Sequence, residues 1–397
     1  MDQNATPLPR GFRVAGVHCG IKQRSDALDL SLVLAEREVV AAGVYTQNRV
    51  VAAPVAWDRD ITPSDRVRAV LINSGNANAC TGERGATDTA AMAAETARAI
   101  GASAEQVLIL STGIIGEYLP MEAIRAGIPM AVAEAASDEP SLLQAARAIM
   151  TTDRVPKVSH RSFPVGDRSV QLTGIAKGAG MIGPRMATML AVIMTDAALT
   201  PQAAQRFLCS AVERSFNCIS VEGHTSTNDT VLLLASGEIP LDSGAQARFA
   251  DELEELAIDL AKRIPADGEG ATHLITIQVQ GAPDERAARQ VARTIADSPL
   301  VKTAITGGDP NWGRIVSAAG YAGVPFPPDR LRLSVNGVAL FAKGVPLEFD
   351  AAALSQSMRR AFDVRIELEL GMGEASCTFW TSDLTHEYIT INAEYHT

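Results

Sequence analysis

The segment Lys177-Gly-Ala-Gly-Met-Ile-Gly-Pro-Arg-Met-Ala-Thr-Met-Leu190 lies within the clearest break in the composition of the chain, the stretch from Thr151 to Met194. Its three glycines permit positive φ angles and a close approach of backbone to backbone. A strand candidate, Val170–Ile175, precedes the segment, and a second one, Met189–Met194, follows it almost at once. The pattern predicts a glycine-rich turn between two strands, with the pair Ala187-Thr188 where the turn enters the second strand.

Two functional interpretations of this turn compete with a purely structural one. Gly178-x-Gly180-x-x-Gly183 matches a dinucleotide-binding fingerprint, but that fingerprint opens a helix, and Asp196 is a doubtful candidate for its acidic residue. Alternatively, a cut between Ala187 and Thr188 would make Thr188 a chain terminus. Its α-amine, with a reference pKa of about 7.7–8.0, could then act as the base for its own hydroxyl. Local sequence alone leaves both functional interpretations open. It equally allows the structural interpretation, in which the glycines form an ordinary turn and Thr188 is a structural residue of the strand.

Charge and composition exclude several classes of partner. The 397 residues carry 35 Lys and Arg against 46 Asp and Glu, which gives a net charge of −11 and argues against nucleic-acid or anionic-membrane partners. The first residues lack the pattern of a signal peptide and no apolar run is long enough to span a bilayer, so we expect a cytoplasmic protein. Five scattered cysteines, without C-x-x-C pairs, predict reduced thiols and no zinc site.

Strand and helix patterns interleave without a strict β-α-β period, which predicts a layered α+β fold. The expected strands are Val39–Tyr45, Val67–Ile72, Gln106–Leu110, Val231–Leu234, Leu274–Val279, Leu331–Val335, Arg365–Leu370 and Tyr388–Ala393. The expected helices are Ala86–Ile100, Ala203–Phe216 after the cap Thr200-Pro201, Ala245–Ile264, Glu285–Ala296 and Ala351–Phe362.

The glycine-rich segment up to Thr188-Met-Leu resembles the signature of the ornithine acetyltransferase family, and further blocks agree in the family's order over essentially the whole chain. These blocks are Asn73-Ser-Gly-Asn-Ala-Asn78, Ser111-Thr-Gly-Ile-Ile-Gly116, Met150-Thr-Thr-Asp153, Thr225-Ser-Thr-Asn-Asp229, Asp267-Gly-Glu-Gly-Ala-Thr272, Gly308-Asp-Pro-Asn-Trp-Gly-Arg314 and Asn392-Ala-Glu-Tyr-His-Thr397.

The resemblance implies a self-cleaving N-terminal-nucleophile enzyme with an α/β/β/α sandwich. It implies an α chain, residues 1–187, and a β chain, residues 188–397, associated as α2β2. The implied reaction moves acetyl from N-acetylornithine to glutamate by a ping-pong route through an acetyl-Thr188 ester, in arginine biosynthesis. No metal or organic cofactor is implied. Some family members also use acetyl-CoA, and the sequence leaves that donor open.

The resemblance also implies roles for individual residues. Thr112 and Gly113 match an oxyanion hole, although Ser-Thr-Gly is also ordinary turn chemistry after a strand. The positions that match substrate contacts are Thr151, Lys177, Thr188, Glu269, Asn392 and Thr397. Hydroxyl, amide and ammonium donors suit an α-carboxylate, and a carboxylate suits an amine. We expect the blocks at 73–78 and 309–314 to be scaffold.

Two positions depart from the family pattern. The block around Glu222-Gly223-His224 more commonly carries acidic residues in the family, and His273 stands where a Lys is usual after Gly-Ala-Thr. Both put substrate specificity, but not the nucleophile, in question. A hydrolase or aminopeptidase of the same nucleophile type, in which water resolves the acyl-enzyme, is the alternative function.

Overall fold

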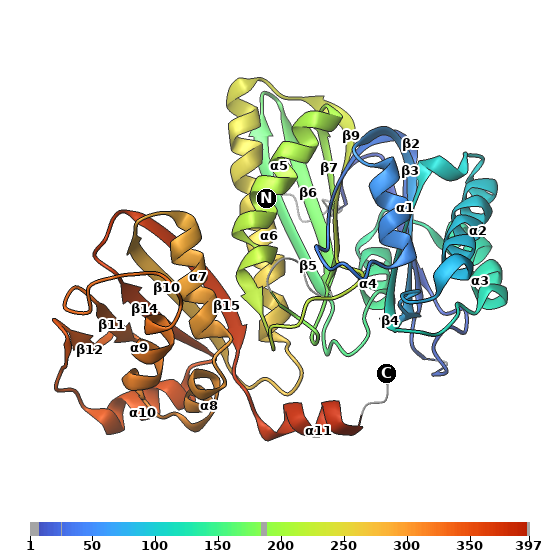
Figure 1. Cartoon of the computed structure of the whole chain (residues 1–397). Helices are drawn as coiled ribbons and strands as arrows, with labels where there is room; N and C mark the ends of the chain where they lie inside the picture. Colours follow the sequence, from blue (N-terminus) through green and yellow to red (C-terminus); the bar gives the residue numbers. More distant parts are fainter. Residues whose placement is uncertain (1–7, 25, 184–188, 395–397) are drawn as a thin grey trace.

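The computed structural model describes residues 8–24, 26–183 and 189–394 (Figure 1). Within these residues the larger sheet has eight strands in the order β4-β3-β2-β9-β7-β6-β5, with β1 paired to β2. Its strands are β1 (Phe12–Val17), β2 (Leu30–Tyr45), β3 (Ser64–Asn76), β4 (Val107–Ile114), β5 (Lys157–Val165), β6 (Arg168–Lys177), β7 (Leu190–Ala198) and β9 (Thr230–Pro240).

This sheet curls until its two halves face each other. One cluster of buried side chains takes Val70 and Leu108 from β3 and β4, and Val192 and Leu232 from β7 and β9. The outer face of the first half packs on α2 (Gly82–Ile100) and α3 (Met121–Glu134), and the outer face of the second half packs on α5 (Pro201–Arg214) and α6 (Ser243–Ala266). The layers are therefore α/β/β/α, which confirms the expected sandwich and the α+β class.

Two further helices close the edges of the sandwich. Helix α4 (Glu139–Ala148) packs on β1 and contributes Leu142 and Ala145 to the cluster between the two halves. Helix α1 (Ala53–Ile61) packs on β4 and α2.

A second-sheet unit follows the sandwich along the chain. Among the described residues its sheet has seven strands in the order β13-β12-β11-β14-β10-β15-β8. Its strands are β8 (Ile219–Ser220), β10 (Leu274–Ala282), β11 (Arg332–Val335), β12 (Val338–Ala342), β13 (Val345–Pro346), β14 (Asp363–Glu369) and β15 (Ala375–Ser382). Its helices are α7 (Glu285–Ala296), α8 (Pro299–Gly307), α9 (Trp312–Gly320) and α10 (Ala351–Arg360).

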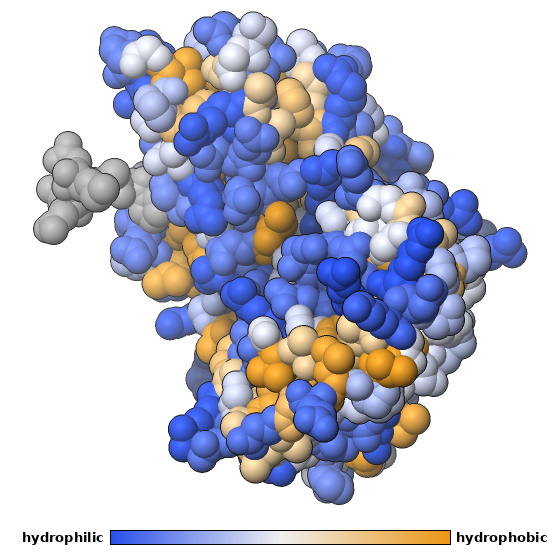
Figure 2. Space-filling model, turned by 90° about the vertical axis from the view of Figure 1, so that its left-hand side faces the viewer, coloured by the Kyte–Doolittle hydropathy of each residue, from blue (hydrophilic) through white to orange (hydrophobic). Residues whose placement is uncertain are grey.

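The two parts share one apolar core. Helix α6 contributes Leu256 and Leu260, and β10 contributes Ile277, to a single cluster of buried side chains. Seen from the side of the second-sheet unit, apolar residues gather over part of the surface among polar ones (Figure 2). No helix in the described part of the chain is long and apolar enough to cross a membrane.

Local sequence signals account for most elements. Thr200 caps α5 by accepting a hydrogen bond from the Ala203 amide, and Pro201 starts the helix, as the sequence predicts. The predicted strand Tyr388–Ala393 is wrong, because this segment lies in helix α11 (His386–Glu394). Its apolar residues alternate as in a strand, but no strand pairs with it in the described residues and none of its side chains is buried.

Candidate functional site

The glycine-rich segment connects two neighbouring antiparallel strands. Lys177 ends β6 and is the register partner of Leu190, which begins β7. Because a strand and not a helix follows the glycines, the dinucleotide-binding interpretation is wrong. The predicted cleavage pair, Ala187 and Thr188, lies outside the described residues. The next residue, Met189, is held in place, since its amide donates to Asp229 Oδ1 at 3.1 Å.

Lys177 brings three of the predicted residues together. Its buried Nζ donates to Thr151 Oγ1 at 2.7 Å and to Thr112 Oγ1 at 3.2 Å. It lies 4.0 Å from a carboxylate oxygen of Asp153. Burial lowers the pKa of Lys177, and the Asp153 carboxylate opposes that shift. The result is a buried cation with two hydroxyl oxygens around it.

Thr112 and Gly113 lie within β4, which extends to Ile114, and not in a loop after it. Gly113 has a φ of +136°, a region that L side chains rarely adopt. A Cβ atom added to it would lie 2.2 Å from the carbonyl carbon of Gly75 on β3. Glycine is therefore required here, because β3 and β4 approach each other too closely for any side chain.

Asp153 fixes the start of the glycine-rich turn, a role that the sequence analysis did not assign. Its Oδ1 accepts from Lys157 Nζ at 2.7 Å and from the Gly178 amide at 2.6 Å. Burial raises the pKa of Asp153, but the charges of Lys177 and Lys157 outweigh burial and bring it to about 2. Lys157 also donates to Asp267 at 2.8 Å. The carboxylate therefore stays ionised and anchors both the lysine and the turn.

Glu269 packs directly on the glycine-rich turn. Its amide donates to the Ala179 carbonyl at 2.9 Å, and its carboxylate leaves no room for a Cβ on Gly180. Asn392 Nδ2 donates to Glu269 Oε2 at 2.9 Å, so α11 brings two predicted residues together. The negative charge of Glu269, like that of Asp153, opposes the lowering of the Lys177 pKa by burial, so the two side chains interact electrostatically. The remaining predicted contact, Thr397, lies outside the described residues.

Glu222 is a further carboxylate at this site. The amides of Val221, Glu222 and Gly223 all donate to the Ile182 carbonyl, at 2.8–3.2 Å, which places this block against the turn. Neither carboxylate oxygen of Glu222 reaches solvent or has a hydrogen-bond partner among the described residues. Burial raises the pKa of Glu222 to about 8, and the charge of Glu269 adds to the shift. From the sequence, this block stood out only as a departure from the family pattern, and no role was assigned to Glu222.

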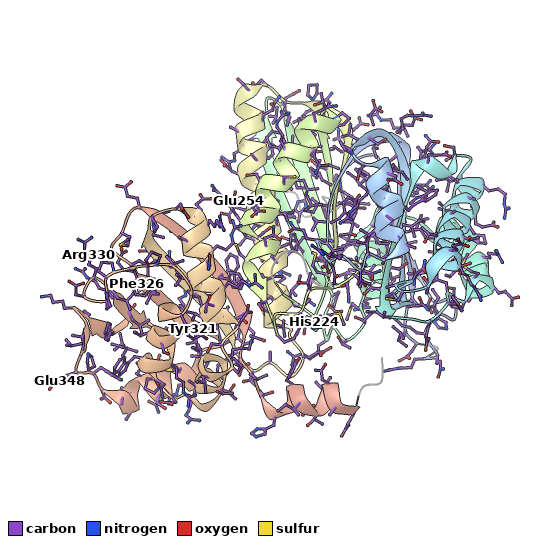
Figure 3. The ribbon with its side chains drawn as sticks, viewed as in Figure 1. His224, Glu254, Tyr321, Phe326, Arg330 and Glu348 are labelled. Carbon is purple, nitrogen blue, oxygen red and sulfur yellow. The ribbon has the colours of Figure 1, made fainter. Side chains whose placement is uncertain are left out.

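The two departures from the family pattern differ in their surroundings. His224 is exposed and is labelled in Figure 3. His273 instead lies 3.1 Å from Asp383 Oδ2, and its amide donates to the other oxygen of the same carboxylate. His273 is therefore engaged in a local hydrogen-bond network.

A cavity of about 870 Å³ adjoins the lysine. Gly113 and Thr151 line it, together with the basic side chains of Lys22, Arg147 and Arg154. Lys22 Nζ donates to the carbonyls of Leu28 and Met150, both at 2.8 Å. The acidic side chains of Asp26, Glu117 and Asp153 also line the cavity. The site thus opens onto a space with charged groups of both signs, which suits a ligand that carries both a carboxylate and an amine.

Fold and site define a class: a two-layer β sandwich between helices, with a buried lysine–threonine site under a glycine-rich strand connection. The chain belongs to the ArgJ family, whose model matches residues 13–397. This membership confirms the resemblance of the sequence blocks.

Curated relatives match over nearly the whole chain. The "Arginine biosynthesis bifunctional protein ArgJ" of Rhodopirellula baltica is 47% identical over 397 residues, which cover 98% of this chain and 96% of the relative. The protein of the same name from Geobacter sulfurreducens is 45% identical and covers 98% and 99%. Among solved structures, "Ornithine Acetyltransferase complexed with Ornithine" from Mycobacterium tuberculosis is 40% identical, covers 46% of this chain and 96% of that chain, and has a TM-score of 0.41.

Proposed function

We propose that this protein is a glutamate N-acetyltransferase that moves the acetyl group of N2-acetyl-L-ornithine to L-glutamate. The observation that carries the proposal is the convergence of Lys177, Thr112 and Thr151 beside the connection that contains Thr188. Family membership and the names of the relatives as bifunctional proteins of arginine biosynthesis support the same function.

The chemistry begins with cleavage between Ala187 and Thr188, which gives residues 1–187 and 188–397. The freed α-amine of Thr188 takes the proton of its own hydroxyl, and Oγ attacks the acetyl carbonyl of N-acetylornithine. The tetrahedral intermediate collapses with loss of the ornithine amine, which leaves with a proton and yields acetyl-Thr188. The amine of glutamate then attacks this ester. One amide is exchanged for another, so no metal or organic cofactor is needed.

The surroundings fit the charges that this route creates. Lys177 donates to the Thr112 oxygen, so the Thr112 hydroxyl keeps its own proton to donate to an oxyanion, alongside the Gly113 amide. Such a donor lowers the barrier by about 3–4 kcal/mol. Lys177, Thr151, Asn392 and Thr397 supply donors for the substrate carboxylate, and Glu269 supplies an acceptor for its amine.

The test starts with intact mass and N-terminal sequencing under denaturing conditions. We expect two chains, the second beginning Thr-Met-Leu-Ala. Thr188→Ser should retain some cleavage, because it keeps a hydroxyl, whereas Thr188→Ala should abolish both cleavage and transfer. Thr87→Ala, at an exposed position on α2, is the matched control and should change neither. Cleavage of the Thr188→Ala protein would contradict the mechanism.

A second assay separates the transferase from a hydrolase of the same nucleophile type. N-acetylornithine consumption is measured with and without glutamate, and acetylglutamate is quantified. A transferase requires the acceptor, whereas a hydrolase releases acetate at the same rate without it. Replacing N-acetylornithine by acetyl-CoA in the same assay tests the second donor.

We propose an α2β2 assembly. The second-sheet unit exposes the large side chains of Tyr321, Val345 and Leu347, which supports a protein contact there. The cytoplasmic location expected from the sequence stays a prediction.

A further inference from the structure

Two cysteines far apart in the sequence meet outside the site described above. Cys218 Sγ lies 3.9 Å from Cys377 Sγ, and the residues are 159 positions apart. All five cysteines belong to the described part of the chain, and this is the one thiol–thiol pair within hydrogen-bonding reach there. None of the proposed catalytic steps uses either thiol.

The pair is built by strand pairing. Cys218 ends the short helix η2 (Phe216–Cys218) and directly precedes β8, which runs parallel to β15. Ile219 is the register partner of Trp380, and Cys377 lies three residues earlier on β15. The pairing of β8 with β15 therefore brings the two sulfur atoms close to each other.

A cavity gives reagents access to the pair. Its volume is about 310 Å³, and both cysteines line it with Trp380 and several charged side chains. Cys218 is buried, whereas Cys377 is half-buried. Glu254 of α6, which also lines the cavity, is labelled in Figure 3. The cavity therefore lies between α6 and the second-sheet unit.

The charges around the sulfurs make the two thiols unequal. The charged groups are Arg214, Arg289, Glu213, Glu254 and Glu285. Arg289 pairs with Glu213, and its buried Nε has no hydrogen-bond partner among the described residues.

The Cys218 hydrogen bond lowers the pKa of Cys377, and the Arg289 guanidinium lowers it further against the effect of burial. The same hydrogen bond and burial raise the pKa of Cys218. Cys377 is thus the more readily ionised thiol of the pair, and Cys218 is placed to donate a hydrogen bond to it.

We propose that Cys377 and Cys218 form a peroxide-oxidisable dithiol site, with Cys377 as the attacking thiol and Cys218 as the resolving thiol. The Cys377 thiolate attacks one oxygen of hydrogen peroxide, the O–O bond breaks, and a sulfenic acid and hydroxide form. The Cys218 sulfur then attacks the sulfenic sulfur, the S–OH bond breaks, and water leaves with the Cys218 proton. In balance, two thiols and one peroxide give a disulfide and two waters, so two electrons pass from sulfur to oxygen.

The geometry needs only a local adjustment. A disulfide requires a sulfur separation of about 2.05 Å, so the two sulfur atoms must approach by about 2 Å. Cys218 lies at the end of a single helical turn, and the proposal requires rotation of both side chains together with a small shift of that turn. The bond would tie the end of η2 to β15, three residues before Val221, whose amide donates to the Ile182 carbonyl of the glycine-rich turn.

The test uses the full-length protein in its native, reduced form. It is treated with a small excess of hydrogen peroxide, denatured without reductant, alkylated, digested and mapped by mass spectrometry. We expect a Cys218–Cys377 cross-linked peptide pair, a loss of about 2 Da from the intact mass, and reversal by dithiothreitol. The proposal is overturned if Cys218 and Cys377 are both recovered as free alkylated cysteines at a peroxide dose that oxidises the exposed Cys80 and Cys209. It is also overturned if Cys377 is recovered as a sulfinic acid with no cross-link.

Variants assign the two roles. Cys218→Ser removes the resolving thiol, so Cys377 should accumulate as a sulfenic acid that dimedone traps. Arg289→Gln removes the cation and should slow the first step. Cys209→Ser, at an exposed position on α5, is the matched control and should leave the cross-link unchanged. The mapping of wild-type protein decides the question even where a variant fails to fold.

Discussion

Lys177 is the residue on which the candidate site depends, because it is buried, charged and hydrogen-bonded to two threonine hydroxyls. We predict that Lys177→Met lowers kcat/KM for N-acetylornithine by about 10- to 150-fold, the equivalent of about 1.5–3 kcal/mol for a hydrogen bond to a charged group. Steady-state kinetics on the folded variant measure this change. Lys262→Met, on the partly exposed side of α6, is the control. Equal kcat/KM values for both variants would show that Lys177 does not contribute to the reaction.

Glu222 predicts a particular pH dependence of stability. Its pKa is raised from 4.5 to about 8 in the folded chain, so the folded state binds a proton that the unfolded state has already lost. The stability from this group is fully present below pH 4.5 and is lost as the pH rises through about 8.

Glu222→Gln does not titrate, so the Tm of the variant should rise relative to wild type between about pH 5 and pH 9. Thermal unfolding at several pH values measures this difference, with the exposed Glu36→Gln as control. A Tm difference that stays constant with pH would show that Glu222 is already ionised in the folded protein.

At the scale of the element, β4 depends on close contact with β3 at Gly113. We predict that Gly113→Ala destabilises the protein by about 1–3 kcal/mol, because the added Cβ would lie 2.2 Å from the Gly75 backbone and force the strands apart. Chemical denaturation measures the loss. Gly116→Ala is the matched control, since Gly116 also has a positive φ, +87°, but open space around its missing Cβ. Equal losses would mean that φ alone, and not the contact with β3, constrains Gly113.

The elements also show where sequence patterns succeed and where they fail. Runs such as Val231–Leu234 and Leu274–Val279 are buried strands, because β-branched and aliphatic side chains suit a sheet between two apolar layers. The segment at 388–393 has the same alternation but forms a helix on the surface. Alternation predicts a strand only where a neighbouring strand exists to pair with it, and pairing is decided by residues distant in the sequence.

Part of the site could also be predicted from the sequence. Thr112, Thr151 and Lys177 could be selected from blocks that resemble a family, and the structure brings them together. The parts played by Asp153 and Glu222 could not be assigned, because each depends on burial and on charges from other elements. The sequence does not reveal that Lys157 faces Asp153. Nor does it reveal that the carboxylate of Glu222 is closed off from water.

At the scale of the whole molecule, the proposed cut falls between two strands of one sheet. Strand β6 pairs with β7 from Leu172↔Thr195 to Lys177↔Leu190, and β2 pairs with β9. The cluster between the two halves of the sandwich also contains side chains from both sides of the cut, such as Val70 and Leu232.

We predict that residues 1–187 and 188–397 stay together after cleavage. They should elute as one species in native size-exclusion chromatography and separate only in denaturant, because separation would expose the core. The uncleaved Thr188→Ala protein serves as the reference for elution volume. Dissociation of the two chains under native conditions would contradict this prediction.

The short connection between β6 and β7 has a consequence for the lifetime of the protein. In the uncut precursor these strands find each other as neighbours on one chain, at the small entropic cost of closing a short loop. Once the connection is cut, the same encounter is a collision between two molecules, and its rate falls with dilution. The precursor can therefore refold after each unfolding event, whereas unfolding of the mature enzyme separates its two chains. The lifetime of the mature enzyme is then set by the rate at which it unfolds.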